Sequence, residues 1–290
     1  MNDQHVDPTT TGTQVGDDTV PDLYLSGRRK RNRSKTIRLT AYAIGVAVIV
    51  VAAVFADWGT VADNYLDWER AKRLFPDIVK VAVKNTVLYT TTSFVGGVIL
   101  GVVAALMRLS SIRVYRWIAA VYTEVFRGLP ALLTIIFIGY LAPIAFKFQF
   151  PTVLGLPTGG IVALSLVAGA YLSETIRAGI EAVPKGQIEA ARSLGMSHAA
   201  TLRHVVVPQA FRIVIPPLTN ELVLLLKDTS LLAVLGTTPL SKELTQFGRD
   251  EAFKGFNSTP IVAAGVMYLI ITIPLTRLVA NLEKRNKAAR

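Results

Sequence analysis

The sequence predicts an all-α integral membrane protein with six transmembrane helices. Of its 290 residues, 51% are hydrophobic and only 18% are charged, and the mean hydropathy is +0.44. An ordinary soluble domain carries about 25% charged residues, so a lipid bilayer is the expected solvent. Six apolar runs are each long enough to cross a hydrocarbon core of about 30 Å, and the basic residues gather in the segments beside them.

The first segment, residues 1–38, is expected to be a disordered basic tail. Residues 1–27 are rich in Asp, Thr, Gly and Pro and contain too few large apolar residues to offset the entropy of ordering them. The run Arg28–Lys35 is strongly basic, and such runs also occur in proteins that bind nucleic acid. Because this run lies almost directly before an apolar span, we attribute it to membrane topology and expect no nucleic-acid partner.

Residues 39–58 are expected to form an N-terminal transmembrane helix, beginning with the run LTAYAIGVAVIVVAAVF from Leu39. A cleaved signal peptide is disfavoured because the run is long, starts late in the chain and is followed by no small-residue cleavage site. The next segment, from Asp57 to Lys80, mixes Trp and Tyr with balanced charges, as expected of an interfacial loop on the far side of the membrane.

Five further apolar runs follow, at approximately Asn85–Met107, Tyr122–Phe146, Gly160–Ile180, Ile213–Leu235 and Ile261–Leu282. The loops and ends assigned to the cytoplasm are those rich in Lys and Arg: Arg108, Arg113 and Arg116 after the second span, Lys185, Arg192, Arg203 and Arg212 between the fourth and fifth, and the C-terminal tail from Glu283. The loop after the fifth span has equal numbers of acidic and basic residues and suits the outside. Both termini are therefore expected in the cytoplasm.

The long loop between the fourth and fifth spans, residues 183–217, has a pattern of its own. Ile188, Ala191 and Leu194 follow helical spacing, and Gly195 ends that helix. The segment should therefore fold as a helix, a turn and a second helix. Such an element on the cytoplasmic side can present a compact surface to a partner protein.

This loop resembles the cytoplasmic loop of permeases of ATP-binding-cassette (ABC) importers. The family pattern is Glu-Ala-Ala, three residues, Gly, nine residues, Ile, one residue and Leu-Pro, and its positions here are Glu189, Ala190, Ala191, Gly195, Val205, Val207 and Pro208. The two Val residues replace Ile and Leu conservatively. The resemblance implies that Glu189, Ala190, Ala191, Gly195 and Pro208 couple the chain to a separate ATPase subunit.

Four other stretches resemble the polar amino acid uptake branch of these permeases: Tyr122–Pro130, Gly169–Gly179, Val183–Gln187 and Leu226–Leu231. The resemblance extends over residues 82–285 and implies the five-helix core of a type I importer, to which residues 39–58 add one helix. The nearest likeness is to glutamate-uptake permeases of actinobacteria, although these motifs do not separate glutamate from glutamine, arginine or histidine systems.

Ionisable residues within the spans are candidates for the substrate pathway, because each costs about 2.5–3.5 kcal/mol on insertion scales. The candidates in the third and fourth spans are Arg127, Glu174 and Arg177. Glu174 could take the ammonium of an amino acid, and Arg127, beside the expected helix break at Gly128–Pro130, could take its carboxylate. The alternative is that Glu174 simply pairs with Arg177, one turn later.

Further candidates lie near the end of the fifth span: Lys227, Asp228, Thr229 and Ser230. Here the alternative is an internal ion pair between Lys227 and Asp228 that positions the helix. Gly97 and Gly101 form a GxxxG spacing, which we attribute to helix packing.

The sequence contains no GxxxxGK[ST], HExxH or GxSxG motif and no cysteine, so we expect no enzyme activity and no cofactor on this chain, with ATP and Mg²⁺ on the partner ATPase. His198 and His204 have no Cys or acidic cluster beside them, so no metal site is expected. The expected partners are an ABC ATPase dimer, a second identical or related permease subunit, an extracytoplasmic amino acid binding protein and membrane lipid. The expected location is a bacterial cell membrane.

Three alternatives remain at this point. A gradient-driven carrier or channel would be expected to contain inverted repeats, which are not recognisable here. A membrane adaptor that only recruits an ATPase would not need charges in three spans. An exporter is disfavoured because the branch that the chain resembles works with binding proteins for import.

Overall fold

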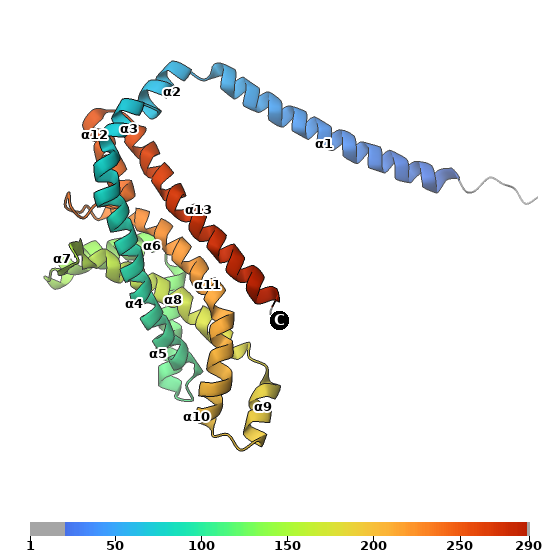
Figure 1. Cartoon of the computed structure of the whole chain (residues 1–290), viewed down its shortest axis with the longest axis vertical. Helices are drawn as coiled ribbons and strands as arrows, with labels where there is room; N and C mark the ends of the chain where they lie inside the picture. Colours follow the sequence, from blue (N-terminus) through green and yellow to red (C-terminus); the bar gives the residue numbers. More distant parts are fainter. Residues whose placement is uncertain (1–20, 289–290) are drawn as a thin grey trace, which may run out of the picture. The chain divides into compact units, whose positions relative to one another are not determined.

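The computed structural model describes residues 21–288, which are almost entirely helical (Figure 1). The chain divides into two units, residues 1–59 and 60–290. In the first unit, α1 (Pro21–Phe55) contains the apolar stretch Ile37–Phe55, which is long enough to cross a membrane. Of the tail expected over residues 1–38, residues 1–20 lie outside the described residues, and residues 21–38 are helical as part of α1.

The second unit continues with α2 (Trp58–Tyr65), which begins just before the boundary between the units. The elements that follow are α3 (Trp68–Asp77), η1 (Ile78–Val83), α4 (Lys84–Leu109), α5 (Arg113–Gly128), α6 (Ala131–Ile136), η2 (Phe137–Leu141), α7 (Ala142–Phe146), β1 (Thr152–Val153), β2 (Leu156–Pro157), α8 (Thr158–Glu181), α9 (Lys185–Ser193), α10 (His198–Thr201), η3 (Leu202–Val206), α11 (Val207–Asp228), η4 (Thr229–Val234), α12 (Leu244–Gly255) and α13 (Thr259–Ala288). Three of these, η1, η2 and η3, are π-helical turns.

Within the described residues, five helical stretches are long and apolar enough to span a membrane, and a bent pair of helices supplies a sixth candidate. This confirms the predicted all-α membrane fold. The bent pair corresponds to the expected third span. It begins at Arg113, earlier than expected, and turns by 109° between Gly128 and Ala131. The turn lies where the sequence indicated a helix break, at Gly128–Pro130.

The centre of the second unit is the contact between α4 and α8. Lipid tails are as apolar as the side chains, so helices in a bilayer associate through close packing and hydrogen bonds. A Cβ on Gly97 would lie 2.9 Å from the Cβ of Ala168, and one on Gly101 would lie 2.8 Å from the Cβ of Leu172. The GxxxG spacing is therefore a helix packing contact, which only glycine allows at this separation.

Polar side chains add hydrogen bonds between these helices. Ser165 Oγ of α8 donates to the carbonyl of Ser93 in α4 at 3.2 Å, and Tyr122 Oη of α5 donates to the carbonyl of Leu166 at 2.8 Å. Each such bond contributes about 0.6 kcal/mol in a membrane protein. The Ser165 bond joins α8 to α4, and the Tyr122 bond joins α8 to α5, which carries one of the candidate residues.

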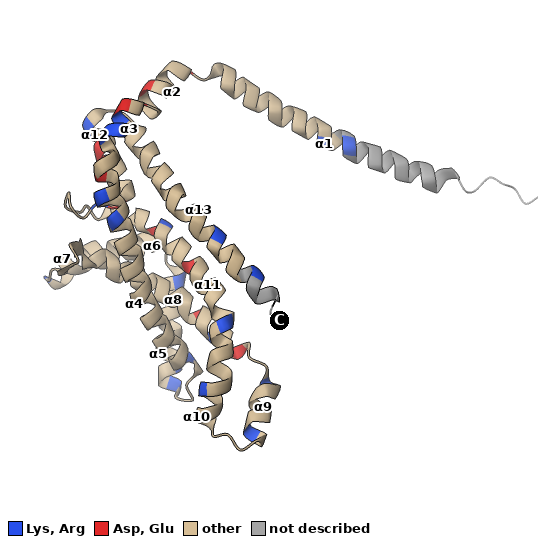
Figure 2. Ribbon diagram, in the orientation of Figure 1, with Lys and Arg blue, Asp and Glu red and all other residues tan. Residues whose placement is uncertain are grey.

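The two ends of the second unit differ. The α9–α10 segment lies at one end, and α3 and α12 lie at the other (Figure 1). Charged residues gather at both ends, and a few lie part of the way along α8 and α11 (Figure 2). This is the distribution expected of a bundle that crosses a bilayer, with the intramembrane charges as the exception that needs an explanation.

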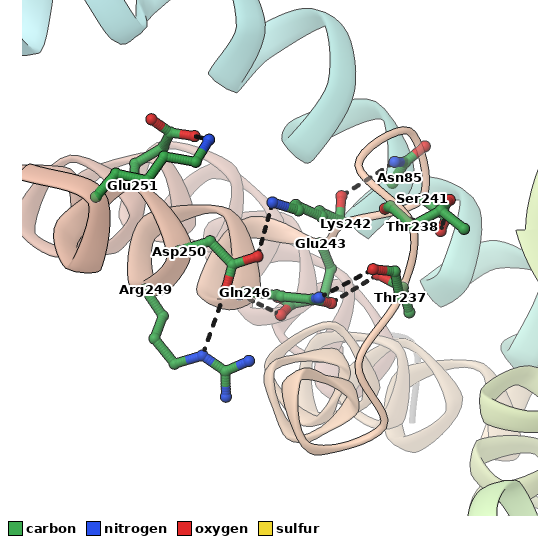
Figure 3. A network of polar contacts seen from close by, with 11 residues as sticks. Asn85, Thr237, Thr238, Ser241, Lys242, Glu243, Gln246, Arg249, Asp250 and Glu251 are labelled. Atoms are coloured by element: carbon green, nitrogen blue, oxygen red, sulfur yellow. Dashed lines mark hydrogen bonds and ion pairs between the residues drawn. The ribbon is translucent and has the colours of Figure 1, made fainter.

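A buried polar network holds the segment before α12 (Figure 3). Glu243 is only 1% exposed and caps α12: its carboxylate accepts from the backbone N–H groups of Thr245 and Gln246, both at 2.6 Å. Tyr268 Oη of α13 donates to the same carboxylate at 2.9 Å. On the other side, Asn85 Nδ2 of α4 donates to the carbonyls of Leu240 and Lys242 at 2.8 and 3.0 Å. The network thus joins α4, α12 and α13.

Burial raises the pKa of Glu243 to about 7, although the hydrogen bonds that it accepts act in the opposite direction. Between its ordinary pKa of 4.5 and about 7, the folded protein holds a proton that the unfolded chain has released. Stability therefore falls as the pH rises through this window, by at most about 3 kcal/mol. We expect a lower melting temperature at pH 8 than at pH 5.5, measured on the purified protein in detergent.

The matched variants for this measurement are Glu243→Gln and Glu251→Gln. Gln at position 243 is uncharged at both pH values, so it should remove most of the difference. Glu251 pairs with Lys254 near the surface at 2.6 Å, and its replacement should leave the difference intact. An unchanged pH response in Glu243→Gln would contradict the assignment to this carboxylate.

Candidate functional site

The first candidate region is a cluster of charges around Glu174 in α8. Arg177 Nη2 lies 2.7 Å from Glu174 Oε2, one turn further along the helix. Arg108, at the end of α4, places Nη2 at 3.5 Å from the other carboxylate oxygen. The three side chains are 21–28% exposed, so the cluster is half-buried. The pairing of Glu174 with Arg177, which the sequence left as an alternative, is formed here, and Arg108 adds a partner that was not predicted.

The cluster extends at both ends. Arg177 Nη1 also pairs with Glu181 Oε2 at 2.8 Å, and Arg177 Nε is buried and has no hydrogen-bond partner among the residues that the structure describes. Arg127, in the last turn of α5 before the 109° bend, holds its guanidinium 5.5 Å from the ring centroid of Tyr171 in α8. This is within the range of a cation–π contact. Arg108 of α4 and Arg177 of α8 therefore pair with Glu174, and Arg127 of α5 contacts α8 one turn earlier, through Tyr171.

The second candidate region is the end of α11. The α-helix ends at Asp228, and Thr229 and Ser230 begin the 3₁₀-helical turn η4. Thr229 is fully buried, and its hydroxyl donates to the carbonyl of Leu226 at 2.6 Å. Lys227 is exposed and Asp228 is half-buried, and in the described part of the chain no salt bridge joins them. The internal ion pair expected as the alternative is therefore not formed.

Glu221 is a further intramembrane carboxylate, which the sequence analysis did not single out. It lies in α11 seven residues before Asp228, two helical turns, so the two carboxylates share one face of the helix. Glu221 is half-buried, and among the described residues it has neither a salt bridge nor a hydrogen bond to its side chain. The signal was present in the sequence, since Glu221 lies inside the predicted fifth span. The resemblance drew attention to Leu226–Leu231 instead.

Residues 183–217, named the coupling segment after their expected role, form the predicted helix, turn and helix. Gly195 ends the first helix with a left-handed φ of +84°. The N–H of Gly195 donates to the carbonyl of Arg192, and that of Met196 to the carbonyl of Ala191. This is a common helix-ending arrangement that favours glycine. The second helix runs without a break from α10 through η3 into α11, so it is continuous with a membrane span.

The side chains of this segment divide into an inner and an outer set. Ala191 is 6% exposed, and a small apolar core of Val183, Val206 and Ala210 holds the two helices together. Gln209 also hydrogen bonds to Gln187 across them. Leu194, in contrast, is 85% exposed at the tip. A large apolar side chain held in solvent by a rigid turn suggests a protein contact.

The remaining predicted coupling residues, Glu189, Ala190 and Pro208, are exposed on the same segment. Pro208 lies directly after the π-helical turn η3, at the start of α11. His198 and His204 are also exposed, and His204 Nδ1 contacts the carbonyl of Ala200. Within the described residues, no group of three potential ligands from His, Asp and Glu is placed to hold a metal ion.

Comparisons with known proteins agree with these features. Residues 97–288 match the family described as binding-protein-dependent transport system inner membrane component. The arginine transport system permease protein ArgU of Corynebacterium glutamicum is 33% identical over 82% of this chain and 78% of its own length. The L-cystine transport system permease protein TcyB of Bacillus subtilis is 39% identical over 63% of this chain and 76% of its own.

A solved structure of an amino acid ABC transporter with histidines superposes with a TM-score of 0.67 at 32% identity, covering 76% of this chain and 98% of that one. The glutamate/aspartate import permease protein GltK of Escherichia coli O157:H7 is 33% identical over 76% of this chain and 97% of its own. The similarity therefore includes the cluster around Glu174, the end of α11 and the coupling segment.

Proposed function

This chain belongs to the binding-protein-dependent transport system inner membrane components and is an amino acid permease of the ABC importer type, and from that premise we propose that it carries glutamate or a related polar amino acid into the cell. The observation that carries the proposal is the combination of unpaired charges inside the spans with a rigid coupling segment on the same helix, α11. The charges supply contacts for a charged cargo, and the coupling segment supplies a means of driving transport.

We assign the energy source to a partner. The sequence lacks a P-loop, so ATP and Mg²⁺ would bind to two ATPase subunits and not to this chain. The exposed Leu194 and the Glu189–Ala191 helix would dock on the ATPase, with the coupling segment and both termini in the cytoplasm. A second permease subunit would complete the pathway, and an extracytoplasmic binding protein would deliver the amino acid.

The nature of the cargo is supported by the charges and by the relatives. The related permeases are named for cystine, arginine, glutamine, and glutamate or aspartate, all of which carry an ammonium and a carboxylate. Glu221 and Asp228 offer acceptors for the ammonium. Arg127 offers a cation for the carboxylate, beside the broken helix pair α5–α6, and broken helices are common at transporter binding sites.

The mechanism follows from the separation of the ATPase subunits from the permease subunits. ATP binding closes the ATPase dimer and moves the coupling segments, and the two permease subunits change from inward-open to outward-open. Transport requires that cargo binds differently in the two states. Glu174 is already held by two guanidinium groups, so we assign it to the positioning of Arg108 and Arg177 as well as to cargo contact.

The experiment that tests the function is uptake into proteoliposomes containing the complete transporter. Labelled glutamate, glutamine, arginine, histidine and cystine are compared with and without ATP inside the vesicles. ATP-dependent uptake of one of them, requiring the binding protein, is the expected result. Uptake that ignores ATP and follows an imposed ion gradient would instead make the chain a gradient-driven carrier.

Replacing Glu221 with Gln should raise the KM for the cargo by about tenfold, since one hydrogen bond to a charged group contributes about 1.5–3 kcal/mol. The ammonium is common to all the candidate cargoes, so the effect should not depend on which of them is transported. The assay is initial uptake at varied cargo concentration. Glu69→Gln, which removes an exposed carboxylate paired with Lys72, is the control. An unchanged KM in Glu221→Gln would remove this residue from the pathway.

A further inference from the structure

An open polar cavity lies where the ends of α4 and α8 meet the first half of α5. Its volume is about 560 Å³, and four of the side chains that line it are the guanidinium groups of Arg108, Arg113, Arg116 and Arg177. Two of these, Arg108 and Arg177, belong to the cluster around Glu174 already described. The other two project from the first turn of α5 and take no part in the transport mechanism proposed above.

The positive charge at the α5 end of the cavity is not neutralised within the described residues. Arg116 donates through Nη1 to the backbone carbonyls of Ser110 and Ser111 at 3.0 and 3.1 Å, which hold the side chain but leave its charge uncompensated. Arg113 forms neither a salt bridge nor a side-chain hydrogen bond there. Two carboxylates, those of Glu124 and Glu181, also line the cavity, against four guanidinium groups. Glu181 is paired with Arg177, and Glu124 lies eight positions after Arg116 on α5, about 12 Å further along the helix axis.

The surroundings of this end suit the boundary between lipid and water. Trp117 lines the cavity and is 68% exposed, and aromatic side chains of this kind settle at the level of lipid headgroups. Val114 and Ile118, on the same part of α5, are exposed apolar residues that suit contact with acyl chains. A guanidinium group presents several N–H donors in a planar fork that matches two oxygens of a phosphate.

We propose that this cavity binds the phosphate of an anionic phospholipid, with Arg113 and Arg116 as its ligands. Basic pockets between transmembrane helices are a known form of lipid headgroup site. The site would lie in the inner leaflet, because the proposed topology places this end of the bundle in the cytoplasm. Lipid binding itself does not depend on the transport function. A bound headgroup would connect α5 to the end of α8, from which the coupling segment continues.

The test is retention of phosphatidylglycerol by the purified complex. Protein is exchanged into mixed micelles of phosphatidylglycerol and phosphatidylcholine at varied ratio, and bound lipid is counted by native mass spectrometry. We expect each of Arg113→Gln and Arg116→Gln to weaken phosphatidylglycerol binding about fivefold, because one basic residue near an anionic lipid contributes about 1 kcal/mol. Arg113→Lys keeps the charge but loses the planar pair of N–H donors, so its affinity for phosphatidylglycerol should lie between those of the parent protein and Arg113→Gln.

The control is Arg249→Gln, an arginine at the α12 end of the bundle with 42% of its side chain exposed. Size-exclusion chromatography of each variant confirms that it is folded. Equal retention of phosphatidylglycerol by Arg113→Gln, Arg116→Gln and the parent protein would overturn the proposal. Competition separates the possible sources: displacement of the lipid by inorganic phosphate would assign the cavity to a soluble anion, and displacement by glutamate would assign it to cargo release. Either result would reject a lipid site while leaving the transport assay unaffected.

Discussion

Replacing Gly195 with Asp is expected to reduce ATP-driven uptake by at least tenfold while the protein still inserts in the membrane. Gly195 has a φ of +84°, and a side chain in this region costs about 1–2 kcal/mol. A Cβ at this position would contact no other atom within 4 Å, so the effect comes from the backbone and not from a clash. The turn should relax to another conformation, which moves the exposed Leu194 away from the surface that it presents to the ATPase.

The measurement is ATP-dependent uptake in proteoliposomes, with the amount of inserted permease determined in parallel. Gly186→Ala is the matched control, because Gly186 lies in α9 with an ordinary φ and open space around its Cα. Gly195→Ala carries the same backbone cost and should lose uptake to a similar degree, and Leu194→Asp, which leaves the turn intact, should also lose most of it. Full uptake by both Gly195→Asp and Leu194→Asp would show that this segment does not couple the chain to ATP.

The second large effect is expected from Glu174→Gln. This change removes the carboxylate that lies 2.7 Å from Arg177 and 3.5 Å from Arg108, and it leaves both guanidinium groups half-buried without that partner. Removing one member of a buried pair costs about 3–5 kcal/mol, and partial exposure makes the lower end the better expectation here. We therefore expect both the yield of folded protein and the uptake per folded molecule to fall, the uptake by about tenfold or more.

A double variant separates the structural role of Glu174 from a role in the pathway. In Glu174→Gln combined with Arg177→Gln, one carboxylate and one guanidinium are lost together, so the net charge of the cluster is that of the parent protein. We expect the yield of folded protein to recover and uptake to remain low. The double variant is assayed by fluorescence-detected chromatography for folding and by labelled uptake for function. Recovery of both would assign Glu174 to structure alone.

Much of the architecture could be predicted because it depends on local features of the sequence. Apolar runs located the spans, Gly128–Pro130 marked the break between α5 and α6, and Gly195 marked the turn of the coupling segment. Each of these is set by residues that are neighbours along the chain. The size of the bend, 109°, could not be predicted in the same way, because it depends on how α6 packs against α8 and η4.

The parts that escaped prediction depend on contacts between distant residues. Arg108 was assigned to a cytoplasmic loop by its charge, and only the packing of α4 on α8 places it beside Glu174. Glu243 belonged to a polar loop with no net charge, and its burial follows from the approach of α13, which brings Tyr268 to it. Glu221 is different. Its position inside a span could be read from the sequence, but its lack of a salt-bridge or hydrogen-bond partner among the described residues could not.

The uninterrupted helix from α10 to η4 has a mechanical consequence. Residues 198–234 form one rod of 37 residues, about 55 Å in length, with the coupling turn at one end and Asp228 near the other. Pro216 and Pro217 lie between these two sites, and each removes one backbone donor from the helix. The rod can therefore act as a lever with a flexible joint near its middle. Under the proposed function, a push at the coupling turn would reach the proposed cargo-binding residues as a tilt of the far half of the helix, and the stiffness of the helix at the two prolines would set how much of the movement is transmitted.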